Sequence, residues 1–294
     1  MTLLVGYATG GSSDIQARLL ADLAGKELKQ RIIVENKPGM SAAVMLNYLV
    51  RQKADGYTIA STPAGALFAN PFMLKVEYSH TDVTYISAFG RLLQAVSVKG
   101  DSQWKTFDEF VNYAKQNPGK ARYASYAPNS TTHWLMRLVA SDRGIDWTHV
   151  PYNSDGAAAQ ALLGGHVDAI AAASGQVPMV NSGQLRMLAV FNRNRLPQFP
   201  NVPTLEELGY KIPNLTQMTS LTGIVGPKGM PAPVVQKLTA ALDKAYRDPA
   251  FEKLMRDISA PIDIVTGKAY EAEVAESHRI AEKILPALVK EGAK

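Results

Sequence analysis

Short apolar segments alternate with helical segments along almost the whole 294-residue chain, and this alternation restricts the possible folds most. Helical spacing of apolar residues runs through 15–23 and 107–114. Such alternation is typical of an α/β protein with mixed, largely parallel sheets covered by helices on both faces. The strands that we predict are Leu3–Tyr7, Ile32–Val34, Tyr57–Ala60, Val83–Ile86, Leu93–Val98, Arg122–Tyr126, Val167–Ile170, Met187–Val190 and Leu221–Gly226.

Local signals predict where several helices begin and end. Thr106 with Glu109, and Thr204 with Glu207, have the spacing of a capping box, so we predict that a helix begins after each pair. The run 117–119, Asn-Pro-Gly, predicts the end of the first of these helices. Three further helices are predicted near the C-terminus, at Val234–Tyr246, from Pro249, and at Ala269–Lys290.

Composition excludes several classes of protein. The net charge of +5 comes from scattered Lys and Arg without a run of five or six, which argues against nucleic-acid binding. The chain has no cysteine, so thiolate metal sites, cysteine nucleophiles and disulfides are excluded. No stretch of eighteen apolar residues occurs, so we expect a protein that is not embedded in a membrane. Motifs for metals, dinucleotides and P-loop phosphates are also missing, and we expect no metal and no cofactor.

Two stretches repeat one arrangement, in which an apolar strand runs into a small, hydroxyl-rich loop that opens a helix. Leu3–Tyr7 is followed by Ala8–Asp14, and Arg122–Tyr126 is followed by Ala127–His133. A helix start leaves backbone N–H groups unpaired and carries a partial positive charge, so each loop is suited to an anion. Neither loop contains Lys or Arg, which favours reversible capture by amides and hydroxyls over catalysis.

Each of these loops also has a plainer interpretation. Ser12 or Ser13 would simply cap its helix, and Asp14 would favour the dipole of the first turn without being catalytic. In the second loop one cap needs one hydroxyl, so the surplus of polar side chains favours a ligand. Ser130 and His133 could form a nucleophile–base pair, but no carboxylate is evidently placed to orient the histidine. Loops of the same form, which would line a ligand or be capped turns, are Ser61–Gly65, Pro151–Gly156 and Ala171–Gly175.

The chain is long enough for two lobes. The strands near 93–99 and 219–226 are the expected crossovers between the lobes. We therefore expect residues 1–97 and 222–294 to form lobe 1 and residues 98–221 to form lobe 2. Ligands of open parallel sheets bind beyond the carboxyl ends of strands, so the two loops would face one cleft.

The order and spacing of several motifs resemble one family over nearly the whole chain: the periplasmic solute receptors of tripartite tricarboxylate transporters, also called Bug receptors. The resemblance implies a type II periplasmic binding fold of two lobes that closes on a small organic carboxylate. The resembling stretches are Gly10–Asp14, Val34–Gly39, Ala54–Thr58, Tyr113–Lys120, Val150–Tyr152, Leu162–Asp168 and Val202–Thr204.

The resemblance further implies a monomeric receptor that delivers its solute to a two-component membrane permease. It also implies a periplasmic location, and we expect that a signal peptide ahead of Met1 has been removed. Within the family the ligand carboxylate meets the loop after the first strand and a helix-start loop of the second lobe. The ligand-binding residues expected here are Tyr7, Thr9, Gly10, Gly11, Ser12, Thr62, Ala64, Tyr126, Asn129, Ser130, Thr131, Thr132, Asn153 and Ser174.

Two departures from the family pattern bear on the ligand. Ala8-Thr9 replaces the usual prolines before the Gly-Gly pair, and Ala171-Ala172 stands where many relatives carry Phe-Asp. Losing that aspartate argues against an amino-acid ligand and favours an aliphatic or aromatic dicarboxylate, such as a terephthalate-like acid. A carboxylate-sensing regulatory domain is the alternative function, although no helix-turn-helix segment is attached. An enzyme is not expected, because no nucleophile–base–orienter set is evident.

Overall fold

The computed structural model describes residues 1–192, 194–210, 218 and 220–291. The chain divides into two compact units. Unit 1 comprises Met1–Leu92 and Met218–Lys294, and unit 2 comprises Leu93–Gln217. The sequence-based boundaries at 97/98 and 221/222 remain a prediction of how the chain is organised.

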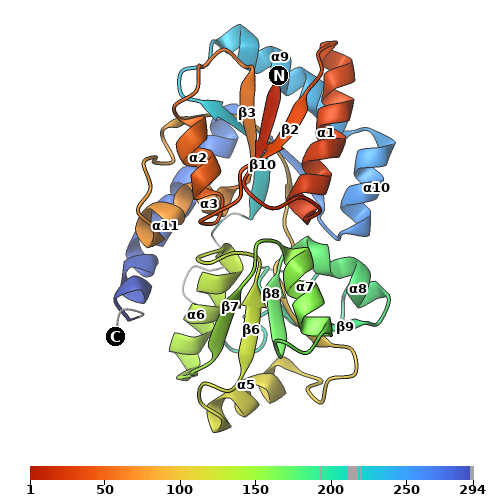
Figure 1. Cartoon of the computed structure of the whole chain (residues 1–294), viewed down its shortest axis with the longest axis vertical. Helices are drawn as coiled ribbons and strands as arrows, with labels where there is room; N and C mark the ends of the chain where they lie inside the picture. The colour runs from red at the N-terminus through yellow and green to blue at the C-terminus, as the bar shows by residue number, and fades with distance from the viewer. Residues whose placement is uncertain (193, 211–217, 219, 292–294) are drawn as a thin grey trace. The chain divides into compact units, whose positions relative to one another are not determined.

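Unit 1 is built on a six-stranded sheet with the order β11-β4-β10-β3-β1-β2. From the pairings, β1 to β4 run in one direction, whereas β10 and β11 run against them. Helices α1, α9 and α10 pack together, as do α3, α4 and α11, and Figure 1 shows α1 and α2 on opposite sides of the sheet. The elements of unit 1 are β1 (Thr2–Val5), α1 (Ser12–Leu28), β2 (Ile33–Asn36), α2 (Ala43–Leu49), β3 (Thr58–Pro63), α3 (Ala64–Phe68), α4 (Asn70–Met73), β4 (Val83–Arg91), β10 (Leu221–Pro227), α9 (Ala232–Tyr246), α10 (Pro249–Asp257), β11 (Ile262–Thr266) and α11 (Gly267–Glu291).

Unit 2 is built on a five-stranded sheet with the order β7-β6-β8-β5-β9. Strands β6 to β9 run in one direction and β5 runs against them between β8 and β9. The predicted α/β fold with mixed, largely parallel sheets is therefore confirmed. The elements of unit 2 are β5 (Ala95–Lys99), α5 (Phe107–Gln116), β6 (Arg122–Ser125), α6 (Thr131–Arg143), β7 (Thr148–Pro151), α7 (Asp155–Leu163), β8 (Ala169–Ala172), the 3₁₀ turn η1 (Ser174–Gln176), α8 (Val177–Asn181) and β9 (Leu185–Val190).

The two capping boxes lead into different structures. Thr106 and Glu109 form the reciprocal bonds of a capping box at the start of α5, as predicted. Thr204 and Glu207 form the same bonds, with the Glu207 N–H donating to Thr204 Oγ1 at 3.1 Å. However, the chain then reverses through Gly209 at φ +74°, so the predicted helix is wrong and a turn takes its place. A capping box satisfies a first turn but cannot extend it past a left-handed glycine.

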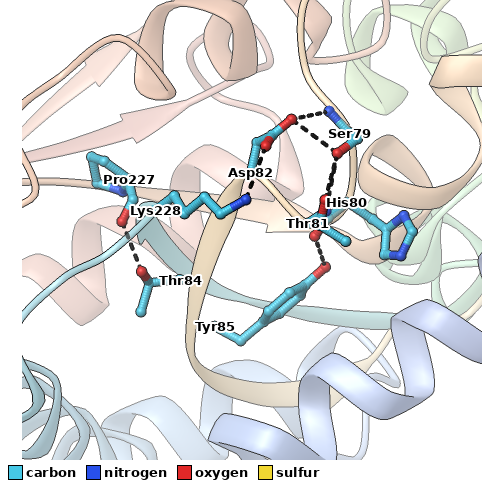
Figure 2. Close-up of polar contacts among 8 residues, drawn as sticks. All are labelled: Ser79, His80, Thr81, Asp82, Thr84, Tyr85, Pro227 and Lys228. Atoms are coloured by element: carbon cyan, nitrogen blue, oxygen red, sulfur yellow. Dashed lines mark hydrogen bonds and ion pairs between the residues drawn. The ribbon is translucent and has the colours of Figure 1, made fainter.

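The beginning of β4 is tied to the end of β10 in unit 1 (Figure 2). The Asp82 carboxylate accepts hydrogen bonds from the N–H and the hydroxyl of Ser79, both at 2.9 Å, and lies 3.5 Å from Lys228 Nζ. One residue into β4, Thr84 Oγ1 donates to the Pro227 carbonyl at 2.8 Å. The Thr84–Pro227 and Asp82–Lys228 contacts therefore join the beginning of β4 to the end of β10.

Candidate functional site

The loop after β1 is the first candidate anion-binding position, and it ends at a helix without a side-chain cap. The N-cap of α1 is Gly11, whose backbone is extended and which has no side chain to offer to the first turn. The prediction that Ser12 or Ser13 caps this helix is therefore wrong, because the helix begins at Ser12 itself. Gly10 adopts φ +84°, a conformation that glycine reaches at little cost. The start of α1 thus keeps the open form that favours an anionic ligand.

Asp14 holds this loop in place from the first turn of α1. Its side chain is 2% exposed and accepts hydrogen bonds from the Gly10 N–H at 2.9 Å, from Arg18 Nε at 2.9 Å and from Asn36 Nδ2 at 2.8 Å. Burial alone would raise the pKa of this carboxyl, but hydrogen bonds from Arg18, Gly10 and Asn36 hold the pKa below its ordinary value. Asp14 is therefore an ionised positioning residue of the loop.

Asn36, at the end of β2, extends the same network. Its Nδ2 donates to the Tyr7 carbonyl at 3.0 Å as well as to Asp14. Its Oδ1 accepts from Arg18 Nη2 at 2.9 Å and from Thr9 Oγ1 at 3.3 Å. The sequence reasoning missed Asn36 and Arg18, although Asn36 lies two residues beyond the predicted strand Ile32–Val34, which pairs with β1.

A strained segment, residues 40–42, lies close to Gly6, which follows β1. Met40, Ser41 and Ala42 have positive φ values of 47°, 52° and 69°, which cost a non-glycine residue about 1 kcal/mol or more each. Gly6 makes room for Ala42, because a Cβ atom at residue 6 would lie 2.3 Å from Ala42 Cβ. Asn70, which is 1% exposed, donates to the Ser41 carbonyl at 2.9 Å and keeps this segment in place.

Thr62 and Ala64 emerge at the same edge of the sheet as this loop. Val5 is paired with Ser61 across β1 and β3, so Thr62 lies one position beyond the last paired residues, level with Gly6. Both Thr62 and Ala64 are fully buried, and Thr62 Oγ1 donates to the Pro63 carbonyl at 3.3 Å. Unit 1 therefore brings its predicted ligand-binding residues together at the carboxyl ends of β1 and β3.

The start of α6 is the second candidate position, and its own side chains already occupy part of it. Ser130 is the N-cap, and its Oγ accepts from the His133 N–H at 3.3 Å and lies 3.4 Å from Thr132 Oγ1. Burial raises the pKa of Tyr126 to about 12, while hydrogen bonds from the Thr131 hydroxyl and from the backbone of Thr131 and Thr132 oppose this rise. The neutral Tyr126 hydroxyl therefore lies against the first turn of α6.

His133 is held as a neutral acceptor and is not paired with the Ser130 hydroxyl. Its Nδ1 accepts from the N–H of Asn129, a residue with φ +53°. His133 stacks on His149, with ring centroids 3.7 Å apart. Ser125 Oγ donates to the Ala127 carbonyl, so His149 Nε2 must donate to Ser125 Oγ, at 2.8 Å. The nucleophile–base alternative for Ser130 and His133 does not match this geometry.

Both histidines lose basicity through their surroundings. Burial, with His149 and Arg137 nearby, lowers the pKa of His133 to about 3. Burial and Arg137 lower the pKa of His149 to about 4. The pair is therefore uncharged at neutral pH, and it fixes the Asn129 turn that precedes α6.

The remaining predicted residues of unit 2 lie at the ends of β7 and β8. Ser125 pairs with both Pro151 and Ala171, so the segments after β6, β7 and β8 emerge at one edge. Asn153 is exposed there, whereas Ser174 is fully buried and its Oγ has no hydrogen-bond partner among the described residues. The neighbouring Gly175 N–H donates to Asp155 Oδ2 at 3.0 Å, a contact that the sequence reasoning did not foresee.

Neither a metal centre nor a membrane span is found in the part of the chain that the structure describes. Within that part, no group of three or more His, Asp or Glu side chains could hold a metal ion. The helices of the same residues include none with the length and hydropathy needed to cross a membrane.

A family model and several curated proteins match this chain over most of its length. Residues 16–284 match the family described as tripartite tricarboxylate transporter family receptor. The chain is 36% identical over 287 residues to the "UPF0065 protein in gbd 5′region" of Cupriavidus necator, covering 97% of this chain and 86% of that protein. It is 28% identical over 252 residues to BugT of Bordetella pertussis, covering 84% and 76% of the two chains.

Solved structures share the fold over nearly the full length. The periplasmic binding protein BugD matches with a TM-score of 0.90 and 26% identity, covering 98% of this chain and 97% of that chain. An R. palustris protein solved with adipate matches with a TM-score of 0.88 and 24% identity, covering 99% and 97%. MatC of Rhodopseudomonas palustris, solved with malate, matches with a TM-score of 0.85 and 24% identity, covering 98% of each chain. The two-unit α/β architecture is thus that of periplasmic binding proteins.

Proposed function

Since this chain belongs to the tripartite tricarboxylate transporter receptor family, whose members are solute-binding receptors, we propose that it captures a small organic carboxylate in the periplasm. The captured acid is then delivered to a two-component membrane permease of the same transporter type. The receptor acts as a monomer, and its two units close on the acid when it binds.

The observation that carries this proposal is the uncapped start of α1, where a preformed loop of uncharged donors ends at a helix N-terminus. Asp14 and Asn36 hold the loop, so little ordering is left for the ligand to impose. A carboxylate of the acid binds here, and the start of α6 supplies further contacts. The proposed ligand-binding residues are Tyr7, Thr9, Gly10, Gly11, Ser12, Thr62, Ala64, Tyr126, Asn129, Ser130, Thr131, Thr132, Asn153 and Ser174.

The acid is proposed to be an aliphatic or aromatic dicarboxylate. Proteins of the same fold have been solved with adipate and with malate, which are both dicarboxylates. The end of β8 carries the small residues Ala171 and Ala172, both fully buried, in place of a side chain that would pair with an ammonium group. This composition supports a ligand without a positive charge.

Thermal unfolding of the purified protein against a panel of acids tests the proposal. A ligand that binds only the folded state stabilises it by about 4 kcal/mol at 1,000 times its Kd, so a dicarboxylate of the right size should raise Tm by several degrees. Mass spectrometry of small acids that copurify would identify the natural ligand. A rise in Tm with aspartate or glutamate alone, or conversion of the acid to a product, would contradict the proposal.

A further inference from the structure

Gln16 is buried in unit 1 without hydrogen-bond partners. Its side chain is 1% exposed, and neither its amide oxygen nor its amide nitrogen has a partner among the residues that the structure describes. Other described side chains lack a partner at one buried atom, but Gln16 lacks partners at two. A buried amide whose donor and acceptor are both unpaired destabilises the folded protein, so its presence requires an explanation.

The position of Gln16 connects it to the start of α1. Each Cα–Cβ bond of an α-helix tilts towards the N-terminus, so a side chain lies over the turn that precedes it. For Gln16 that turn begins at Ser12, which is about 6 Å away along the helix axis. Gly11 places no side chain at this end of the helix, and the Asp14 carboxylate is engaged by Gly10, Arg18 and Asn36. The amide of Gln16 is therefore a polar group of the second turn that lies over the first turn of α1 and has no partner among the described residues.

We propose that Gln16 determines specificity by pairing its amide with a hydroxyl group of the bound acid. This inference rests on the proposed function, since it needs a carboxylate at the start of α1. The amide oxygen needs a donor and the amide nitrogen needs an acceptor. A carboxylate only accepts and an ammonium group only donates, whereas a hydroxyl does both. The preferred ligand is therefore a hydroxy acid.

This role predicts two effects of opposite sign for Gln16→Met. Methionine has a similar length but no amide, so the ligand-free protein should become more stable, with a Tm higher by about 2 °C. The same change removes the partner of the ligand hydroxyl, so binding of the hydroxy acid should weaken. A glutamine that merely packed or bonded within the protein would not produce this combination.

The experiment measures Tm without ligand and affinity by calorimetry for matched pairs of acids. The pairs are malate with succinate and 2-hydroxyadipate with adipate. The wild-type protein should prefer the hydroxy acid of at least one pair by about 10-fold or more, and Gln16→Met should lose that preference while it binds the unsubstituted acid as before. Gln52→Met is the matched control, because the Gln52 amide is already bonded to the Tyr48 carbonyl. The control should keep the wild-type preference and show no rise in Tm.

Three results would overturn the inference, and they separate it from the proposed function. A lower Tm of ligand-free Gln16→Met would show that Gln16 stabilises the fold. Dicarboxylate binding with the same hydroxyl preference in wild-type and Gln16→Met protein would refute the role of Gln16 and leave the receptor function intact. If no acid of the panel binds the wild-type protein, both the receptor proposal and the inference built on it fail.

Discussion

At the scale of single residues, the loop after β1 owes its shape to Asp14 and Asn36. One carboxylate accepts from the backbone of Gly10 and from two side chains, and Asn36 adds the Tyr7 carbonyl. These bonds span the loop from its first residue to the first turn of α1. A ligand would therefore meet an arrangement that the protein has already fixed.

Asp14→Asn should destabilise the protein by about 2 kcal/mol, because hydrogen bonds to a buried charged acceptor are lost or weakened. Urea unfolding measures this loss. Asp22→Asn on the same helix is the control, since Asp22 is 61% exposed in its pair with Lys26 and the change should cost less than about 0.5 kcal/mol. Equal losses in the two variants would show that Asp14 does not hold the loop.

The effect of Asp14 should also depend on pH in one direction. Its pKa is lowered in the folded protein, so its stabilisation is complete above the unfolded pKa of about 4 and is lost as the pH falls through the lower folded value. The difference in unfolding free energy between wild-type and Asp14→Asn protein should therefore shrink in acid.

The role of a single residue could be predicted only where its neighbours along the chain determine its position and contacts. The position of Asp14 in the first turn of α1 could be inferred from its distance from Gly10 and Gly11 along the chain. Its bond to Asn36 could not be predicted, because it depends on the parallel pairing of β1 with β2. The expected serine cap of α1 was wrong, since Gly11 already supplies the extended N-cap conformation.

At the scale of elements, the start of α6 combines a structural cap with the proposed ligand contacts. Ser130→Ala removes the acceptor for the His133 N–H and should cost about 1 kcal/mol of stability. It should also weaken binding of whichever acid the panel identifies. Thr106→Ala removes the equivalent cap of α5 and is the matched control. Unfolding should show equal losses of stability in the two variants, and calorimetry should show weaker binding of the acid in Ser130→Ala alone. Unchanged binding in Ser130→Ala would argue against a ligand contact at the start of α6.

The stack of His133 on His149 couples α6 to β7 and should make unit 2 sensitive to acid. Both pKa values are lowered in the folded state, to about 3 and about 4, so the unfolded state binds more protons below its pKa of about 6.5. Stability is therefore fully present above about pH 6.5 and falls as the pH drops towards 4.

His149→Phe keeps an aromatic ring in the stack but removes one titrating group. The free energy of unfolding should then fall less steeply between pH 6.5 and 4, as measured by urea unfolding across that range. His166→Phe, at an exposed position, should leave the wild-type slope unchanged. A wild-type slope in His149→Phe would mean that this histidine is not kept neutral by the fold.

Most elements could be predicted because their signals lie within them. The apolar spacing and the Thr106 cap of α5 mark this helix on their own, and the sequences of α9, α10 and α11 also sufficed to predict helices there. Strand β8 begins two residues later than predicted, at Ala169, since pairing with β6 decides its ends. The prediction of a helix after Thr204 was wrong, because the capping box of Thr204 and Glu207 determines only the first turn and not the reversal of the chain at Gly209.

At the scale of the whole molecule, the chain completes most of unit 1, folds unit 2 as an insert, and then returns through β10. Strand β10 lies between β3 and β4, which precede it by more than a hundred residues. Alternation of strands and helices predicts the α/β class, but it does not give such pairings. The length of the chain and the strands near 93–99 and 219–226 led to the expectation of two lobes, and the likeness of the motifs to one family implied the same organisation.

Closure on the ligand is the motion that the proposed function requires. Small-angle X-ray scattering of the protein with a saturating acid should give a smaller radius of gyration than the protein alone. A non-binding amino acid at the same concentration serves as the control. An unchanged radius with an acid that calorimetry shows to bind would argue against closure as the signal to the permease.

The most direct test of carboxylate capture is a crystal structure of the protein with the tightest-binding acid of the panel. We predict that one carboxylate lies within hydrogen-bonding distance of the loop Tyr7–Ser12, at the start of α1, and that the same molecule contacts the Tyr126–Thr132 segment. An acid bound elsewhere, with neither helix start in contact with it, would contradict the account.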